Sequence, residues 1–222
     1  MKPKVFGKYM FRGAVLGMAV AALGAAAWAP VLYESQSLYY KFGLEKVMLQ
    51  AGKSIGWVVL VLMVGQVLLV ARSVFLERRI PLKLLMSLHR GCGTLIGILV
   101  LVHPLLILWA DGFSLFPLER RYWPEFLGGF TAVFVAAIVA ASKFRTRLHI
   151  GYKSWQRLHR ICTPVAVILA FVHAWFVSET FHHMVPRTGL FIAAGAALAL
   201  FAGIYIRRHA GRAKAGKHGE EK

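Results

Sequence analysis

Residues 154–178, SWQRLHRICTPVAVILAFVHAWFVS, decide the fold of this chain. The stretch is apolar enough, and long enough at about 20 residues, to cross a membrane as a helix, and it carries His159 and His173. Residues 87–110, SLHRGCGTLIGILVLVHPLLILWA, form a second such run with His89 and His103. In each run the two histidines are fourteen residues apart. We therefore predict two transmembrane helices that carry matched histidines.

The equal spacing places both histidines of each helix on one face. Residues fourteen apart end roughly 40° from the starting face and about 21 Å further along the helix. Two such helices that face each other give an inner pair, His89 with His159, and an outer pair, His103 with His173. Bis-imidazole ligation suits a haem iron that passes electrons, because no axial position stays open for a substrate. The spacing thus predicts two haems, with these four histidines as the iron ligands.

The residues between the histidines leave room for a flat macrocycle. The face of the first helix includes Gly93, and the face of the second is small throughout, with Thr163, Ala166 and Ala170. Glycines four apart, such as Gly93 and Gly97, also occur where helices only pack closely, and a lone intramembrane histidine often serves a hydrogen bond between helices. Four histidines at two equal spacings favour the haem interpretation, since ionisable groups at membrane depth are costly and usually functional.

The composition excludes a soluble domain. The chain has 222 residues, of which 58% are hydrophobic and 16% are charged, and its mean hydropathy is +0.61. The fold class that this predicts is an all-α, six-transmembrane-helix bundle that binds two b haems between its third and fifth helices. The predicted domains are the haem domain, 1–206, and a basic, disordered cytoplasmic tail, 207–222. The six helices are expected at 13–31, 53–72, 87–110, 126–142, 154–178 and 187–206.

The basic residues predict the orientation of this bundle. The net charge is +18, which in a soluble protein would suggest nucleic acid, but the lysines and arginines cluster at helix ends. Most lie in both termini and in the connections after the second and fourth helices. The positive-inside rule then places both termini in the cytoplasm, and we expect a bacterial inner membrane protein that meets anionic lipid. The first helix has two interpretations, a retained span or a cleaved secretory signal ending near Ala27–Ala29.

A short repeat surrounds the inner histidines. The string LHRGC at 88–92 recurs as LHRIC at 158–162, seventy residues later. Arg90 and Arg160 therefore follow the inner histidines, where they either bind haem propionates or only anchor the helices at the cytoplasmic side. Cys92 and Cys162 are expected to be small packing residues at that side, where disulfides are rare. Since no C-x-x-C-H motif is present, the haems are expected to be non-covalent.

The six helices, the paired histidines and the string Lys153-x-Trp155-x-x-x-x-His159 together resemble the ferric-reductase-like transmembrane domain. This superfamily includes NADPH oxidases, ferric reductases and the haem subunit of a periplasmic methionine-sulfoxide reductase system. The resemblance implies that His89 and His159 hold the inner haem, His103 and His173 the outer one, and that Trp155 belongs to the cofactor site. Residues 51–54, AGKS before the second helix, resemble the methionine-sulfoxide reductase group, whereas the four histidines resemble the oxidase pattern.

The function that follows is transmembrane electron transfer by a cytochrome b. A cytoplasmic flavoprotein, with its flavin, or a quinol would reduce the inner haem, because the sequence shows no flavin or dinucleotide motif. The outer haem would pass electrons to a periplasmic protein or a ferric chelate, or serve a methionine-sulfoxide reductase-type repair system. A histidine-containing metal permease is the alternative from another class, and a reduced-minus-oxidised visible spectrum separates it from a cytochrome.

Three outer segments, at 32–52, 111–125 and 179–186, are expected to line the exit for electrons. His182 and His183 in the third segment either bind a metal acceptor such as ferric or cupric ion, or are solvated loop residues. Glu179, Glu119 and Asp111 would add oxygen ligands to such a metal site.

Overall fold

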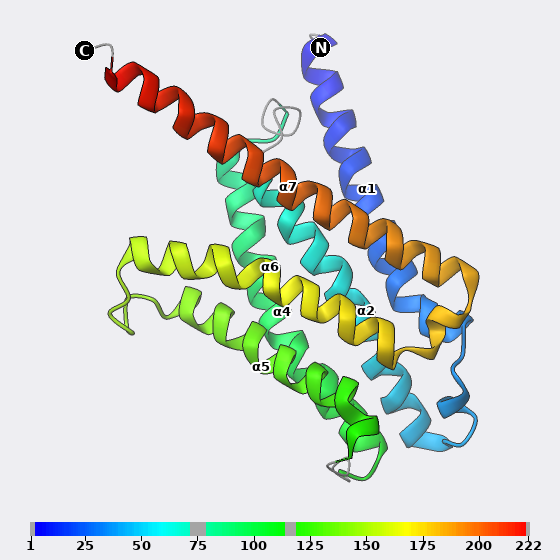
Figure 1. Cartoon of the computed structure of the whole chain (residues 1–222). Helices are drawn as coiled ribbons and strands as arrows, with labels where there is room; N and C mark the ends of the chain where they lie inside the picture. The colour runs from blue at the N-terminus through cyan, green and yellow to red at the C-terminus, as the bar shows by residue number, and fades with distance from the viewer. Residues whose placement is uncertain (1–2, 72–78, 114–118, 221–222) are drawn as a thin grey trace.

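A computed structural model of the chain describes the backbone of residues 3–71, 79–113 and 119–220, and the side chains of 10–71, 79–113 and 119–207. All regular structure in these ranges is helical (Figure 1). The long helices are α1 (Pro3–Leu32), α2 (Gly43–Val70), α4 (Leu82–Ala110), α5 (Trp123–Lys143), α6 (Tyr152–Val177) and α7 (Met184–Glu220). Three short 3-10 helices, η1 (Gln36–Leu38), η2 (Arg120–Tyr122) and η3 (Glu179–His182), lie in the connections.

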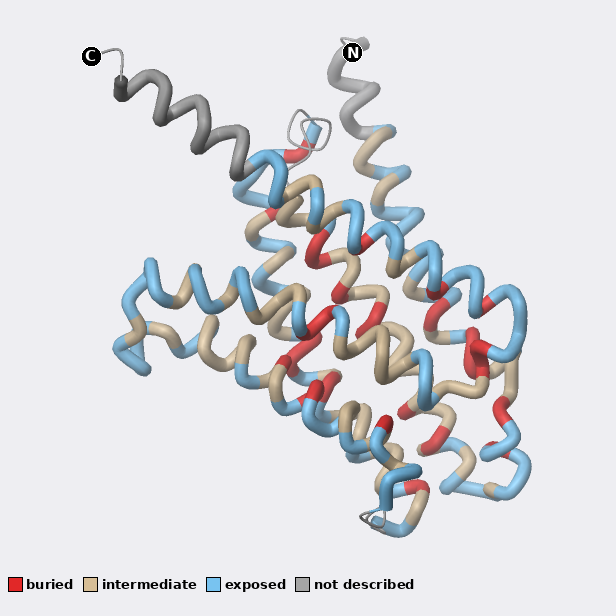
Figure 2. The backbone as a smooth tube through the Cα atoms, viewed as in Figure 1, coloured by how far each residue is buried: buried red, intermediate tan, exposed pale blue. Residues whose placement is uncertain are grey.

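The prediction of an all-α membrane protein with six spanning helices is confirmed. Six helices among the described residues are long and apolar enough to cross a membrane, and in lipid the helix satisfies every backbone polar group internally. Large apolar side chains such as Leu95, Ile98 and Leu101 stay exposed on α4, as expected of a lipid-facing surface. Buried residues follow the inward faces of the helices (Figure 2). The third and fifth predicted helices are α4 and α6.

Two helical hairpins form the centre of the bundle. Helix α2 packs along α4, and α5 packs along α6, while α4 also contacts α5. Helix α1 lies against α2, and α7 covers α2 and η3 (Figure 1). The main core is apolar and joins the two hairpins; its buried members include Met63, Ile96, Val100, Val135, Ala166 and Val167. We call the end of the bundle near His103 and His173 the outer end, and the end near His89 and His159 the inner end.

Several helices begin earlier than the sequence predicts. Helix α2 starts at Gly43 rather than at 53, so residues 51–54 lie inside it and not before it. Helices α4, α5 and α6 start at Leu82, Trp123 and Tyr152. Each of these extensions carries one charged residue (Lys83, Glu125 or Lys153), which the helix tolerates although the apolar span does not include it. Of the basic turn expected at 73–87, residues 73–78 lie outside the described part of the chain.

The last helix extends beyond its predicted end. Helix α7 does not end at 206 but continues to Glu220. The sequence after residue 206 is rich in alanine, arginine and lysine, which are among the best helix formers. Charge and glycine content predicted disorder there, whereas helix propensity favours continuation of a helix that has already formed.

Lys41 connects the α1–α2 segment to the outer end of α4. Its Nζ donates a hydrogen bond to the carbonyl oxygen of Ala110, 2.6 Å away, and lies 3.0 Å from Oδ1 of Asp111. The hydrogen bond to Asp111 raises the pKa of Lys41, so the ammonium stays charged at neutral pH. Leu38, fully buried against Leu49 and Ala110, completes this contact and shortens the loop.

Candidate functional site

The four histidines of α4 and α6 lie in two pairs at two levels of the bundle. The ring centroids of His89 and His159 are 6.3 Å apart, with planes at 88°. Those of His103 and His173 are 6.4 Å apart, with planes at 75°. Each pair takes one ring from α4 and one from α6, and all four side chains are partly buried. The structure therefore brings together the same histidines that the spacing groups.

Both outer histidines are held through Nδ1. Nδ1 of His103 donates to the carbonyl oxygen of Gly52 on α2, 2.8 Å away. Nδ1 of His173 donates to the carbonyl oxygen of Pro124 on α5, 2.9 Å away. A histidine whose Nδ1 is protonated and bonded keeps its lone pair on Nε2, which is how metal-ligating histidines are usually oriented. The two outer rings are thus fixed in the tautomer that a metal needs.

Two glycines make room for the outer rings. A Cβ at Gly56 would lie 2.9 Å from Cε1 of His103, and a Cβ at Gly128 would lie 2.5 Å from Nδ1 of His173. A real Cβ does not come this close, so a side chain at either position would displace the ring. The neighbouring Gly129, in contrast, has no atom within 4 Å of the position of its Cβ. Gly56 and Gly128 are therefore part of the site, and Gly129 is not.

The inner pair is held differently. The indole ring of Trp155 stacks on His159, with centroids 5.4 Å apart and planes at 26°, and its Nε1 donates to Oγ of Ser142 on α5, 3.1 Å away. Trp155 therefore lies directly against His159, and its part in a cofactor site stays a prediction. Within the described residues, Nδ1 of His89 and Nδ1 of His159 are buried without a hydrogen-bond partner. Since buried polar atoms are nearly always paired, the inner level is incomplete as it stands.

The repeat noticed in the sequence extends to both hairpins. In α2–α4, the carbonyl oxygen of Gly52 accepts the hydrogen bond from Nδ1 of His103, and Gly56 faces the same ring. In α5–α6, the carbonyl oxygen of Pro124 accepts the hydrogen bond from Nδ1 of His173. Gly128, again four residues later, faces that ring. The two hairpins therefore present their histidines in the same register, so that the gap between α4 and α6 has pseudo-twofold symmetry at the outer level.

The spacing of each pair fits two imidazoles that share one metal ion. A bond from a first-row metal to an imidazole nitrogen is about 2.0–2.1 Å, and each nitrogen lies about 1.1 Å from its ring centroid, so two opposed rings would have centroids about 6.3 Å apart. The observed separations are 6.3 and 6.4 Å. At the outer level, the two imidazoles whose Nε2 atoms stay free for a metal suit a haem iron.

The other residues predicted for the site occupy distinct places. Gly93 is half-buried on the face of α4 between its histidines, where Ile96 is fully buried. Arg90 and Arg160 are exposed at the inner end, next to His89 and His159 in the chain. This position is compatible with both interpretations of these arginines. The free cysteines, Cys92 and Cys162, are half-buried.

Sequence reasoning missed the residues that support the histidines. Gly52 and Pro124 act through backbone carbonyls, which no side-chain pattern reveals. Ser142 acts on Trp155 through its hydroxyl and lies at the other end of α5 from Pro124. One signal was available: glycine stands four residues after each acceptor, at Gly56 and Gly128. Such a pattern predicts a close approach to a partner helix.

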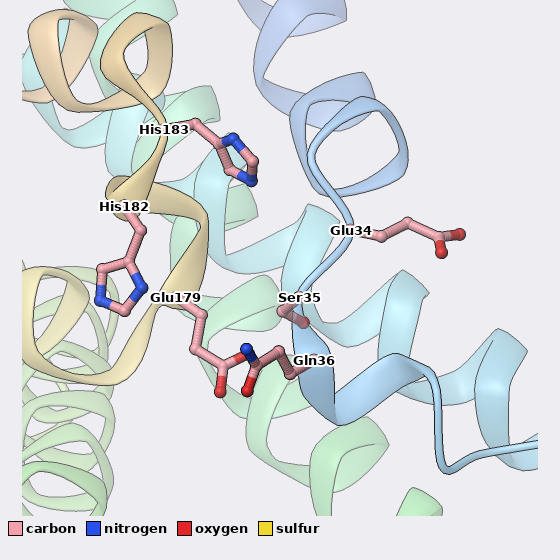
Figure 3. Close-up of a pocket in the computed structure, with 6 residues that line it drawn as sticks. All are labelled: Glu34, Ser35, Gln36, Glu179, His182 and His183. Atoms are coloured by element: carbon pink, nitrogen blue, oxygen red, sulfur yellow. The ribbon is translucent and has the colours of Figure 1, made fainter.

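A separate cavity of about 210 Å³ lies at the outer end, between the α1–α2 connection and η3 (Figure 3). It is lined by Glu34, Ser35, Gln36, Glu179, His182 and His183. The structure does not assemble the metal site that was one of the two interpretations of His182 and His183: no group of three or more histidine, cysteine or acidic side chains among the described residues is placed to hold a metal ion. Asp111 instead pairs with Lys41, and Glu119 pairs with Arg121. His183 packs against Tyr33, with ring centroids 5.2 Å apart.

The chain matches a known protein family. Residues 55–171, more than half of the chain, match a family model described as "Ferric reductase like transmembrane component". The matched segment runs from α2 into α6 and includes His89, His103 and His159. No curated protein matches the chain, and no solved structure matches it either.

Proposed function

Because the chain belongs to the family of ferric reductase-like transmembrane components, we propose that it is a transmembrane cytochrome b that carries electrons through two haem b groups. The observation that supports this most directly is the presence of two histidine pairs, with ring centroids 6.3 and 6.4 Å apart. The pairs lie on the same two spanning helices, and residues fourteen apart are separated by about 21 Å along a helix. Each pair is thus near one side of a bilayer core of about 30 Å.

In this proposal His89 and His159 hold the inner haem, and His103 and His173 hold the outer one. Bound haem supplies a one-electron couple whose potential depends on its ligands and surroundings. The chain supplies the ligands, their orientation and the dry space between them. The carbonyls of Gly52 and Pro124 fix the outer rings, and Trp155 supports His159.

The residues between the two levels keep water out of the path. Ile96, Val100, Ala166 and Val167 are each at most 7% exposed and belong to the central apolar core. Such a core has a low dielectric constant, which excludes ions and protons. Both haems would also be held rigidly, because the histidines come from helices rather than loops. This arrangement favours electron transfer and offers no open ligand position for catalysis at the iron.

The inner end offers a surface for the electron donor. Exposed cations surround the start of α6 and the end of α5: Lys143, Arg147, Lys153, Arg157 and Arg160. In a bacterial inner membrane the positive-inside rule would place this end and both termini in the cytoplasm. A cytoplasmic flavoprotein with an acidic face is the partner that fits such a surface, and a quinol from the lipid is the other possible donor.

The acceptor would approach from the outer end. A periplasmic protein or a ferric chelate can both take single electrons, and a periplasmic methionine-sulfoxide reductase is the acceptor in the alternative form of this function. The exposed His182 and His183 lie at this end. Replacing both by alanine tests whether they take part in electron exit. Reoxidation by a ferric chelate should become slower if they do, and should keep its rate if they are only solvated loop residues.

Proteoliposomes that contain the purified chain and trapped ferricyanide test the function as a whole. External dithionite should reduce the trapped ferricyanide much faster than in protein-free vesicles, because electrons cross through the protein. NADPH without a flavoprotein should not do so. A rate equal to that of protein-free vesicles would contradict transmembrane electron transfer, and rapid oxidation of NADPH by the chain alone would contradict the need for a separate donor.

A further inference from the structure

Gln66 is a polar side chain buried in the apolar centre of the bundle. It is 9% exposed, and within the described residues neither its Oε1 nor its Nε2 has a hydrogen-bond partner. It lies on α2 among the core residues Met63 and Val67. A buried amide without hydrogen-bond partners lowers the stability of a protein. This loss of stability is avoided only when another group forms hydrogen bonds with the amide.

The side chain of Gln66 approaches Gly93 on the facing helix, α4. Oε1 of Gln66 lies 3.9 Å from the point where a Cβ of Gly93 would be. Gly93 follows His89 by four residues, and residues four apart on a helix are neighbours on one face, about 5–6 Å from each other. Nδ1 of His89 is itself buried and without a partner. The unpaired acceptor Oε1 of Gln66 and the unpaired donor Nδ1 of His89 therefore lie within about one helical turn of each other.

The register of α2 and α4 makes this pairing specific. The two helices are antiparallel, and at the outer level the carbonyl of Gly52 receives Nδ1 of His103. Gln66 is fourteen residues after Gly52, and His89 is fourteen residues before His103. Gln66 thus stands opposite His89 as Gly52 stands opposite His103. The neighbouring contacts agree, since Gly56 faces His103 as Gly93 faces Gln66.

We propose that Gln66 is a positioning residue for the inner pair, and that its amide oxygen accepts a hydrogen bond from Nδ1 of His89. The side-chain carbonyl of Gln66 would then do for His89 what the backbone carbonyl of Gly52 does for His103. This bond keeps the lone pair of His89 on Nε2 and makes the imidazole a more basic ligand. Its redox consequence rests on the proposed haem function, whereas the hydrogen bond itself does not.

The second hairpin has no equivalent side chain. The position fourteen residues after Pro124 is Ile138, and its carbonyl oxygen accepts a bond from Oγ of Ser142, 2.8 Å away. The support for His159 comes instead from the stacked ring of Trp155. In this proposal only His89, of the two inner histidines, has a side-chain acceptor. A single substitution at Gln66 should therefore change the potential of the inner haem.

Potentiometric titration of the haem spectrum in the Gln66→Leu variant tests the redox consequence. Loss of the acceptor makes His89 less basic and disfavours the higher oxidation state, so the inner potential should rise. We expect a shift equivalent to a tenfold change in the redox equilibrium, about 59 mV for a one-electron couple. The outer potential should not move. Gln50→Leu, a half-buried glutamine on the same helix, is the control and should leave both potentials unchanged.

An unchanged inner potential in Gln66→Leu would overturn the proposal. So would a lower one, since this would show that the amide donates its N–H to an anionic group. The redox transition of the inner haem is identified as the one that remains in the titration when His173 is replaced by alanine.

A second measurement keeps the hydrogen bond testable if the wild-type chain holds no haem, the result by which the proposed function itself fails. In haem-free protein labelled with ¹⁵N at the histidine ring, the Nδ1 resonance of His89 should move in Gln66→Leu and stay in Gln50→Leu. The same resonance position in all three proteins would overturn the bond.

Discussion

Replacing His173 by alanine should halve the haem content of the purified chain, from two haems to one. His173 holds its place in the outer pair through Nδ1, which is bonded to Pro124, and faces His103 across the gap between α4 and α6. Without its ring the outer site would lose one of the two histidines that would hold the haem, whereas the inner pair lies about 21 Å away along the helix. Transfer of electrons across proteoliposomes should fall to the level of protein-free vesicles.

The matched control is His182→Ala. His182 is exposed and lies at the same end of the bundle, so its loss tests whether any outer histidine would have the same effect. We expect this variant to keep both haems. Retention of two haems by His173→Ala would exclude His173 as a ligand. His103→Ala should reproduce the result of His173→Ala, because both supply the same iron.

A single methyl group at Gly128 should empty the outer site as well. The Cβ of an alanine there would lie 2.5 Å from Nδ1 of His173, and the ring cannot move away without breaking its bond to Pro124. Overpacking of this kind costs about 1–3 kcal/mol. The Gly128→Ala variant should therefore lose the outer haem and unfold at a lower temperature in detergent.

Gly129→Ala is a demanding control because it introduces the same change one residue later. No atom lies within 4 Å of the new Cβ, and exchange of a helical glycine for alanine normally stabilises by about 0.5–1 kcal/mol. This variant should keep both haems and unfold at the same or a higher temperature. If the two variants bound equal amounts of haem and unfolded together, Gly128 would have no role in the site.

The helix number could be predicted because it depends on the length of the apolar runs, and the grouping of the histidines because it depends on helix periodicity. An apolar run of sufficient length must form a helix in lipid, and a spacing of fourteen residues returns to one face whatever the neighbouring residues are. His89 and His159 illustrate this, since they lie side by side although they are seventy residues apart in the chain. Their role as ligands stays a prediction.

The supports of the histidines could not be predicted, because they depend on the register between helices. Every residue has a backbone carbonyl, so the sequence does not mark the ones that act as acceptors. The packing of α2 on α4 selects the carbonyl of Gly52, and the packing of α5 on α6 selects the carbonyl of Pro124. The early start of α2 at Gly43 has a similar origin, because Leu38 and Lys41 bind the outer end of α4 and shorten the loop. The interpretation of His182 and His183 as metal ligands fails for the same reason, since Asp111 and Glu119 pair with Lys41 and Arg121 instead.

The central claim is that α4 and α6 hold two haems, one at each histidine pair. Pyridine haemochrome analysis of the wild-type chain, purified from membranes with haem supplied during expression and normalised to protein by amino-acid analysis, measures this directly. We predict two haem b per chain, with the reduced-minus-oxidised spectrum of a low-spin cytochrome b. A chain that is folded, as judged by its helical circular dichroism, but holds one haem or none would contradict the two-haem account.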